Sequence, residues 1–311
     1  MQRCVVTGGA GFIGSCLVRV LLERGDTSVR VIDDLSTGYA KNLDEVRSRI
    51  EFDQTDIRNY DALASALRGA DTVFHLAAIA SVPRSIDSPV PSHQVNIDGT
   101  FNVFRACAEH KVRRVVYAAS SSAYGDTLTL PKIETMLPHP KSPYAVQKLT
   151  GELYASAFHT CFGLDTVALR FFNVYGPRQD PSSPYSGVIS VFMRAIIERK
   201  PPTIFGDGEQ TRDWTYVDDV AALCLKAASA DGVAGKMYNA GNGGRCSLNH
   251  VWELLQKIEG VSLPANYGPV REGDVRDSQA DRTAVVRDLG HAPRFTLEEG
   301  LRRTLAWYKL Q

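Results

Sequence analysis

The stretch that decides the fold of this chain is QRCVVTGGAGFIGSCLVRVLLERG, residues 2–25. Its first part, Arg3-Cys4-Val5-Val6, is a short β-rich run that leads directly into a glycine-rich turn at residues 7–14. Apolar residues then recur at helical spacing as far as Gly25, a residue typical of helix C-termini. A glycine-rich turn between a strand and a helix N-terminus is the arrangement that binds the pyrophosphate of a dinucleotide.

Three glycines in this turn have separate expected roles. Gly8 permits the tight turn, Gly11 lets a diphosphate approach the backbone, and Gly14 allows the helix to pack closely on the strand. The spacing is G-x-x-G-x-x-G, and a turn that needs glycine without any ligand is the alternative interpretation. The strand before the turn and the helix after it favour dinucleotide binding.

The second predicted strand, residues 29–32, favours NAD over NADP. It ends in Asp33, 19 residues after Gly14. A carboxylate at this position can accept hydrogen bonds from the adenosine ribose hydroxyls and would repel a 2′-phosphate. Asp33 could also act as a turn former before residues 34–38, and the two roles are compatible.

Composition points to a small-molecule partner. The 311 residues contain 35 Lys and Arg and 35 Asp and Glu, which give a formal net charge of zero. No basic cluster indicates a nucleic-acid or membrane surface. The chain has neither a signal-peptide layout nor an apolar run of membrane-spanning length, so we expect a cytoplasmic protein. The six cysteines lack C-x-x-C pairs, and we expect them to be free, buried thiols.

Alternating strand and helix patterns predict an α/β fold with a doubly wound parallel sheet. We assign residues 1–173 to an NAD-binding Rossmann domain that also receives returning segments near 214–242. Residues 174–311 are assigned to a smaller α/β lobe that binds the substrate. The strands are expected at 3–6, 29–32, 50–53, 72–76, 114–119 and 166–171, and the main helices at 61–67, 95–109 and 143–162.

The stretch SPYAVQK at residues 142–148 carries the predicted chemistry. Ser142 is a good N-cap and Pro143 suits the first helical position, so Tyr144 and Lys148 share one helix face at i and i+4. A free tyrosine has a pKa of about 10, which is too high for a base at neutral pH. A neighbouring lysine ammonium and the positive nicotinamide would both lower it. Tyr144 could then remove a hydroxyl proton; an exposed helical pair is the alternative interpretation.

Three consecutive serines, Ser120, Ser121 and Ser122, end the predicted strand before this helix. A hydroxyl here can hydrogen-bond the reacting oxygen of a substrate and relay its proton. Ser120 and Ser122 share one face of an extended strand, so Ser121 should point away if the strand continues that far. Ordinary turn chemistry before Tyr124 is the alternative.

These motifs resemble the extended short-chain dehydrogenase/reductase family, and more narrowly its nucleotide-sugar 4-epimerases. The resemblance covers nearly the whole chain and rests on TGGAGFIGS, VIDDLSTG, HLAA, NIDGT, AASSSAYGD, SPYAVQK, LRFFNVYGPRQDP and IFGDGEQTRD. The segments SVPRS at 81–85 and REGDVRDS at 271–278 are most similar to bacterial UDP-N-acetylglucosamine 4-epimerases. The resemblance implies tightly held NAD, no metal and a homodimer that pairs the helices at 95–109 and 143–162.

The resemblance also implies roles for individual residues. Tyr144 would be the base, with Lys148 beside it and Ser120 or Ser122 as the hydroxyl partner. NAD would be lined by Gly8, Gly11, Phe12, Ile13, Gly14, Asp33, Asp34, Ser36, Thr37, Gly38, Asp56, Ile57, Leu76, Ala77, Ala78, Tyr144, Lys148 and Phe172. The UDP-sugar would contact Ala80, Arg84, Asn96, Asn173, Val188, Phe205, Arg212, Arg271, Asp274 and Ser278. Fixed guanidinium groups suit a diphosphate, although Arg212 and Arg271 could instead form surface ion pairs.

Two departures from related enzymes narrow the expected reaction. Family dehydratases carry an Asp-Glu pair where this chain has Ser121 and Ser122, and its decarboxylases usually carry a glutamate there. Some epimerases restricted to glucose and galactose carry a bulky tyrosine where this chain has Ser278, which leaves room for an N-acetyl group unless it is simply a helix cap. We therefore expect 4-epimerisation of UDP-GlcNAc and UDP-GalNAc, with UDP-Glc and UDP-Gal as further substrates, through a 4-keto sugar. The alternatives are a UDP-glucuronate epimerase or decarboxylase, for which Arg84 could supply a cation, a net dehydrogenase, and an NAD-bound regulatory protein without catalysis.

Overall fold

A seven-stranded parallel sheet forms the larger lobe. The computed structural model of the chain describes residues 2–180, 187–270 and 275–311. The strand order is β11-β6-β5-β4-β1-β2-β3, which confirms the predicted doubly wound sheet. The strands are β1 (Gln2–Thr7), β2 (Thr27–Ile32), β3 (Ile50–Asp53), β4 (Thr72–His75), β5 (Arg114–Ser120), β6 (Thr166–Phe171) and β11 (Lys236–Ala240). Strand order reverses between β1 and β4, and the carboxyl ends of parallel strands form a ligand crevice at such a point.

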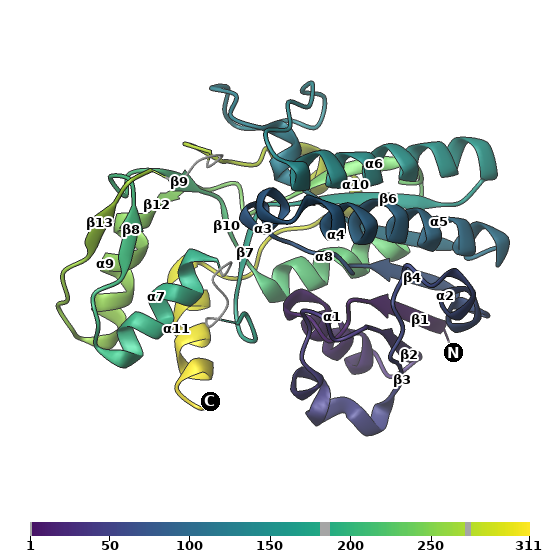
Figure 1. Ribbon diagram of the computed structural model, residues 1–311, viewed down its shortest axis with the longest axis horizontal. Helices are drawn as coiled ribbons and strands as arrows, with labels where there is room; N and C mark the ends of the chain where they lie inside the picture. Colours follow the sequence, from purple (N-terminus) through teal and green to yellow (C-terminus); the bar gives the residue numbers. More distant parts are fainter. Residues whose placement is uncertain (1, 181–186, 271–274) are drawn as a thin grey trace.

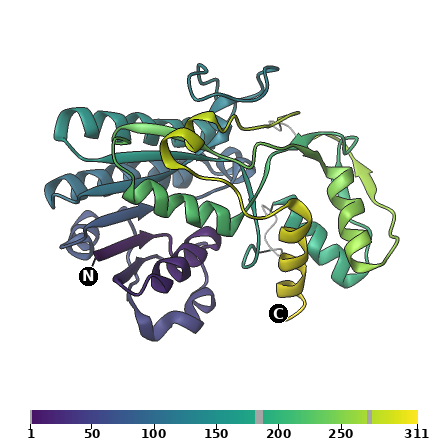
Figure 2. The same ribbon diagram turned by 180° about the vertical axis from the view of Figure 1, so that it is seen from behind.

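Helices cover both faces of this sheet and complete three layers (Figures 1 and 2). On one face, α1 (Phe12–Glu23) packs beside α8 (Val217–Ser229) over a core that includes Leu17 and Val220. On the other face, the core includes Phe104 and Phe158, and the helices are α2 (Tyr60–Leu67), α5 (Thr100–Glu109) and α6 (Pro143–Phe162). Both cores are formed by side chains that alternate across the buried strands.

Shorter helices lead into these layers. The predicted helix at 95–109 is divided in the structure into a π-helical turn, Gln94–Gly99, followed by α5. The predicted bounds of α6 agree with the structure. Further helical elements of this lobe are Ala40–Arg49 (3₁₀), α3 (Val82–Asp87), α4 (Pro89–His93) and Ser121–Tyr124 (3₁₀).

The smaller lobe has its own core, in which Phe192, Trp252 and Leu305 are buried. Its helices stand apart from the large sheet in Figure 1. They are α7 (Val188–Glu198), α9 (Leu248–Glu259) and α11 (Leu297–Tyr308). Short strand pairs accompany them: β8 (Thr203–Phe205) with β13 (Asn266–Gly268), and β9 (Thr211–Arg212) with β12 (Cys246–Ser247). The pair β7 (Asn173–Tyr175) and β10 (Trp214–Tyr216) links the two lobes.

The chain returns to the larger lobe more than once. Helix α8 and strand β11, which lie within residues 214–242, pack into it. Helix α10 (Thr283–Leu289) also belongs there, because Val285 and Leu289 pack into the core beside α1 and α8. The predicted assignment of all residues from 174 onward to the substrate lobe therefore does not describe this helix.

All six cysteines are unpaired, but two are not buried as we expected. Cys161 is exposed, because it lies on the outer side of the last turn of α6, and Cys246 is half-buried. Across the described ranges, no helix is both long and apolar enough to span a bilayer.

Candidate active site

The glycine-rich turn brings α1 close to the end of β1. Gly8 has φ 71°, and a Cβ there would lie 2.7 Å from the Ala77 Cα atom. A Cβ on Gly14 would lie 2.2 Å from the Gly8 carbonyl oxygen. Gly11 is the N-cap of α1 and has no side chain that could cover the first turn. The positive end of the helix dipole is thus presented to any group held above the turn.

Above this turn lies a cavity of about 540 Å³, which we call the cofactor cavity. Every residue that was predicted to line NAD lies on its wall, from the glycine turn to Tyr144, Lys148 and Phe172. Sequence reasoning missed several other residues of this wall, among them Thr55, Ile79, Ser81, Val95, Gln179 and Asp180. Of these, Gln179 and Asp180 follow Gly176 and Pro177, residues typical of a loop, but loop residues do not reveal which cavity they face. The N–H groups at the α1 N-terminus could donate to a pyrophosphate, and the Asp33 carboxylate after β2 could accept from a ribose, so these residues fit a dinucleotide.

Asp33 is buried at the end of β2, where it holds the adjoining turns and lines the cofactor cavity. Its Oδ2 atom accepts a hydrogen bond of 2.9 Å from the Ala10 N–H, and Oδ1 accepts one of 2.9 Å from the Leu35 N–H. These bonds join β2 to the glycine turn, while the residue also lines the cofactor cavity. Burial raises the pKa of Asp33 above its usual value, and the two N–H donors oppose that shift.

Tyr144 and Lys148 lie in the first turns of α6, as predicted. Ser142 caps the helix by accepting a 3.2 Å hydrogen bond from the Ala145 N–H. Both side chains line the cofactor cavity, and the Lys148 Nζ atom lies 4.6 Å from the centre of the Tyr117 ring. Burial lowers the pKa of Lys148 to about 7.

The expected lowering of the Tyr144 pKa is not found in the protein alone. Burial raises the pKa of Tyr144, because it disfavours the phenolate, and a hydrogen bond with Ser120 opposes this only in part. A positive pyridinium is therefore the added charge that would have to favour the phenolate.

The strand β5 ends at Ser120, so the three serines do not alternate as strand residues. Ser120 Oγ accepts hydrogen bonds from the Ser122 N–H at 3.2 Å and from the Ser122 hydroxyl at 2.9 Å. Ser121 begins a 3₁₀ turn and lies on a cavity wall with its neighbours, instead of pointing away. Ser120 is the serine that contacts Tyr144, and Ser122 orients it.

Two further cavities adjoin the cofactor cavity. The first, of about 610 Å³, is lined by Ser120–Ser122, Tyr144, Phe172, Asn173, Arg212 and Ser278, and we call it the sugar cavity. The second, of about 590 Å³, is lined by Ala80, Asn173, Val188, Phe205 and Arg212, and we call it the nucleotide cavity. Asn173 lies on all three walls, so one extended ligand could pass from the nucleotide cavity to the end of the cofactor cavity.

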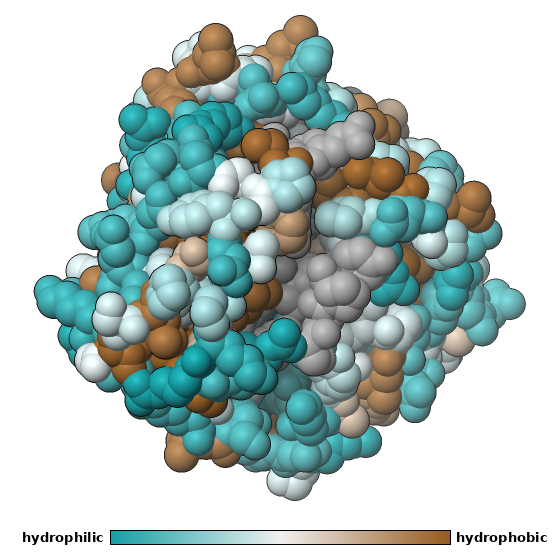
Figure 3. Space-filling model, turned by 60° about the vertical axis from the view of Figure 1, so that its left-hand side comes forward, coloured by the Kyte–Doolittle hydropathy of each residue, from teal (hydrophilic) through white to brown (hydrophobic). Residues whose placement is uncertain are grey.

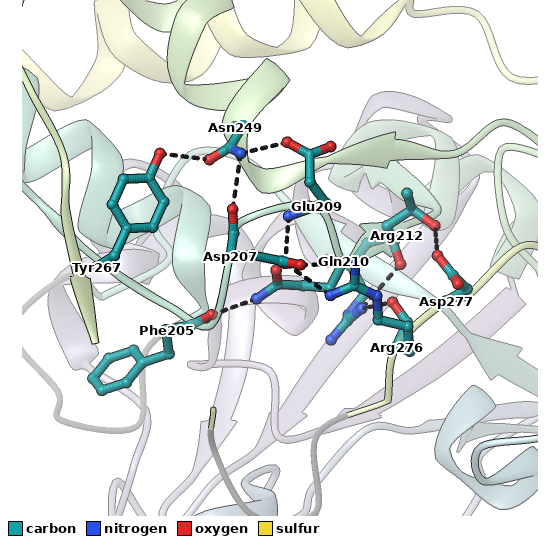
Figure 4. Close-up of polar contacts among 10 residues, drawn as sticks. Phe205, Asp207, Glu209, Gln210, Arg212, Asn249, Tyr267, Arg276 and Asp277 are labelled. Atoms are coloured by element: carbon teal, nitrogen blue, oxygen red, sulfur yellow. Dashed lines mark hydrogen bonds and ion pairs between the residues drawn. The ribbon is translucent and has the colours of Figure 1, made fainter. Parts of the chain in front are cut away.

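Arg212 lines both the sugar and the nucleotide cavities. Figure 4 shows the polar contacts around it. Its Nη1 atom donates to the carbonyl oxygens of Thr211 at 2.9 Å and Arg276 at 3.1 Å. Arg276 in turn forms an ion pair of 2.7 Å with Asp207, and Thr211 bonds Asp277. This network fixes the direction of the Arg212 guanidinium, which suits recognition of a diphosphate.

Two predicted substrate residues, Arg84 and Asn96, are placed differently. Arg84 lines the cofactor cavity and is absent from the described wall of the sugar cavity. Asn96 is buried, and its amide is used by Ile79: Oδ1 accepts from the Ile79 N–H at 2.8 Å and Nδ2 donates to its carbonyl oxygen at 3.1 Å. It therefore supports the loop that carries Ala80. Arg271 and Asp274 lie outside the described residues.

Ser278 has its backbone N–H bonded to the Thr211 carbonyl oxygen at 3.1 Å, and it precedes no helix. The helix-cap alternative is therefore wrong, and its small side chain contributes to the sugar cavity.

Hydrophilic side chains cover most of the face on the smaller-lobe side, and apolar ones are scattered among them (Figure 3). Within the described ranges, no group of three or more His, Cys, Asp or Glu side chains is placed to hold a metal ion.

The chain is similar to known proteins over nearly its whole length. A family description, NAD dependent epimerase/dehydratase family, matches residues 4–241. A UDP-glucose 4-epimerase of Mycolicibacterium smegmatis is 37% identical, with 99% of each chain covered. A solved UDP-N-acetylglucosamine 4-epimerase from Methanobrevibacter ruminantium, in complex with UDP-N-acetylmuramic acid, has a TM-score of 0.95 and 38% identity, over 100% of this chain and 99% of that one.

A third similar structure, a UDP-glucuronic acid 4-epimerase from Bacillus cereus with UDP-glucuronic acid and NAD, has a TM-score of 0.93 and 34% identity, with 99% of each chain covered. The cofactor cavity, the Tyr144–Lys148 pair and these matches over nearly the full length lead to one conclusion. The chain belongs to the NAD-dependent epimerase/dehydratase family, the extended short-chain dehydrogenase/reductases.

Proposed function

We propose that this protein is an NAD-dependent UDP-sugar 4-epimerase, an isomerase, and that its substrates are UDP-N-acetylhexosamines. The observation that carries the proposal is the position of Tyr144 and Ser120 on the wall shared by the cofactor and sugar cavities. A sugar carbon placed there faces the base on one side and the nicotinamide site on the other. The relatives named above act on UDP-sugars, which agrees with a diphosphate at Arg212.

The roles of the protein groups follow from this arrangement. Tyr144 takes the proton of the 4-hydroxyl, and Ser120, oriented by Ser122, hydrogen-bonds the same oxygen. When bound, NAD⁺ supplies the chemistry of accepting and returning the hydride at C4. Arg212 holds the diphosphate while the flat 4-keto sugar turns and presents its other face. The site must therefore bind the nucleotide firmly and the sugar loosely.

The sugar cavity favours a neutral N-acetylated hexose over a hexuronate. Among the described residues of its wall, the Lys132 ammonium bonds Thr127, and Lys141 forms a 3.4 Å ion pair with Asp126. Arg84, which could have paired with a C6 carboxylate, lines the cofactor cavity instead. Ser278 contributes a small side chain where an acetamido group needs volume.

Separate incubations with UDP-GlcNAc, UDP-Glc and UDP-GlcA, followed by NMR, test this proposal. We expect UDP-GalNAc from UDP-GlcNAc as the fastest reaction, slower formation of UDP-Gal, and no epimer of UDP-GlcA. The variant Ser278→Tyr should turn over UDP-GlcNAc at least about tenfold more slowly and keep its turnover of UDP-Glc. The tyrosine would occlude the space for the acetamido group, and a tenfold loss corresponds to about 1.4 kcal/mol of activation free energy. Fastest turnover of UDP-GlcA would refute the substrate assignment, and stoichiometric NADH release would refute epimerisation.

A further inference from the structure

A buried ion pair lies one helical turn beyond Lys148. Glu152 follows Lys148 on α6 by the same four residues that separate Lys148 from Tyr144, so the three share a helix face. The Glu152 carboxylate accepts two hydrogen bonds from Arg170 of β6, 2.9 Å from Nε and 2.7 Å from Nη2. These side chains are only 7% and 2% exposed. Neither residue is on the described walls of the three cavities.

The environment of Lys148 is otherwise short of negative charge. The described groups that face it are Tyr144 and Glu152 on its own helix, the Tyr117 ring on β5, and His75 on β4. His75 is neutral near pH 7, because burial, and then the charge of Lys148, lower its pKa to about 3. Burial likewise lowers the pKa of Lys148, and Glu152 is the group that opposes this shift. Charges interact strongly in such a weakly polar environment.

Arg170 explains how Glu152 can be ionised at all. Burial raises the pKa of Glu152, and the two hydrogen bonds and the charge of Arg170 lower it. Arg170 itself lies over the Tyr124 ring, 4.4 Å from its centre, and the Tyr124 hydroxyl donates to Asn239 Oδ1 at 2.6 Å. A row of alternating charge thus runs from the cofactor cavity into the core: Lys148, Glu152, Arg170.

From this row we infer that Glu152 is a positioning residue for the epimerase reaction. Its carboxylate, held ionised by Arg170, keeps Lys148 charged beside Tyr144. The inference rests on the proposed function, because it assigns Glu152 to the same proton transfer. The competing explanation is a purely structural cross-link between α6 and β6.

Glu152→Gln separates the two explanations, because it keeps the side-chain shape and an acceptor for Arg170 but removes the charge. Without that charge the pKa of Lys148 falls, and the loss of the Lys148 charge raises the pKa of Tyr144. We therefore expect the alkaline limb of the kcat–pH profile to move to lower pH and the acid limb to higher pH. A shift of about one pH unit corresponds to about a tenfold loss of turnover at neutral pH. KM for the UDP-sugar should stay unchanged.

The variant with glutamine at both positions, Glu152→Gln with Arg170→Gln, is the matched comparison. If the Glu152 charge acts on Lys148, the unpaired Arg170 cation left in Glu152→Gln should act on it too. Removing that cation should then return the limbs of the kcat–pH profile part of the way toward their wild-type positions. If the ion pair is only a structural cross-link, the double variant should be at least as impaired as Glu152→Gln. The limbs of the kcat–pH profile should then stay at their wild-type positions in both variants. Exposed Glu253→Gln on α9 controls for a general loss of negative charge.

A second readout does not depend on turnover. Ultraviolet difference titration of the NAD-bound protein, corrected with Tyr144→Phe, reports the ionisation of Tyr144 directly. Its midpoint should rise in Glu152→Gln, and an unchanged midpoint together with unmoved limbs would overturn the inference. If the wild type lacks epimerase activity, the proposed function fails while this titration still tests Glu152. If Glu152→Gln does not fold, the double variant is titrated in its place. Its Tyr144 midpoint should still lie above that of the wild type, by less than we expect for Glu152→Gln, and an unchanged midpoint would contradict the inference.

Discussion

At the scale of single residues, the site depends on a tyrosine whose burial opposes its ionisation. Ser120 and Lys148 are beside Tyr144, yet burial still raises its pKa in the protein alone. We expect Tyr144→Phe to lower kcat by about 10² to 10⁴, the range typical of a lost general acid–base group. Steady-state assays with UDP-GlcNAc and measurement of retained NAD check this, and NAD retention should not change.

Tyr60→Phe, which removes a surface hydroxyl bonded to Glu109, is the control and should keep full activity. Undiminished turnover in Tyr144→Phe would show that the base is a different group. If neither the wild type nor Tyr144→Phe turns over substrate, although both retain NAD, the result would match the alternative of an NAD-bound regulatory protein.

At the scale of elements, α6 reaches its position because one residue lacks a side chain. A Cβ on Gly151 would lie 2.1 Å from the Tyr117 hydroxyl oxygen of β5. Alanine is about 1 kcal/mol better than glycine inside a helix, so helix propensity alone predicts that Gly151→Ala stabilises the protein. We expect the opposite, a destabilisation of about 1–3 kcal/mol by overpacking, together with reduced kcat because Lys148 and Tyr144 shift.

Urea unfolding measures the effect of Gly151→Ala. Ser156→Ala, an exposed position on the same helix, is the matched control and should leave the free energy of unfolding nearly unchanged or slightly higher. A Gly151→Ala protein as stable as the control would show that α6 can move away from β5 freely.

At the scale of the whole molecule, we propose a homodimer in which α5 and α6 of two copies pack together. These helices leave large apolar side chains exposed: Phe101 at 38%, Val146 at 47%, Leu153 at 64% and Phe162 at 66%. Exposed apolar area of this kind on adjacent helices is typical of an interaction surface. Leu153→Asp should convert dimers to monomers in sedimentation experiments at micromolar concentration, whereas Val286→Asp on α10 should not. A wild type that sediments as a monomer would contradict this.

The sequence predicted the sheet and most of the cofactor cavity because both depend on local patterns. The glycine turn, Asp33 and the Tyr144–Lys148 spacing each lie within one strand–turn–helix unit. What it missed depends on contacts between distant segments. Asn96 supports Ile79 across the helix layer, Arg84 lines the cofactor cavity, and α10 returns to the larger core. The pKa of Tyr144 was predicted in the wrong direction for the protein alone, because spacing reveals a neighbouring charge but not the extent of burial.

Strand β11 pairs with the outer edge of β6, although some sixty residues, many of them in the other lobe, separate the two along the chain. A truncated product that stops after β7 would therefore leave the backbone amides and carbonyls of β6 without partners along one border. Such an open border readily pairs with strands of other molecules, which leads to aggregation. During synthesis, the edge of β6 therefore stays unpaired until β11 has been made. The nascent chain is prone to aggregation until then and would benefit from protection in the cell.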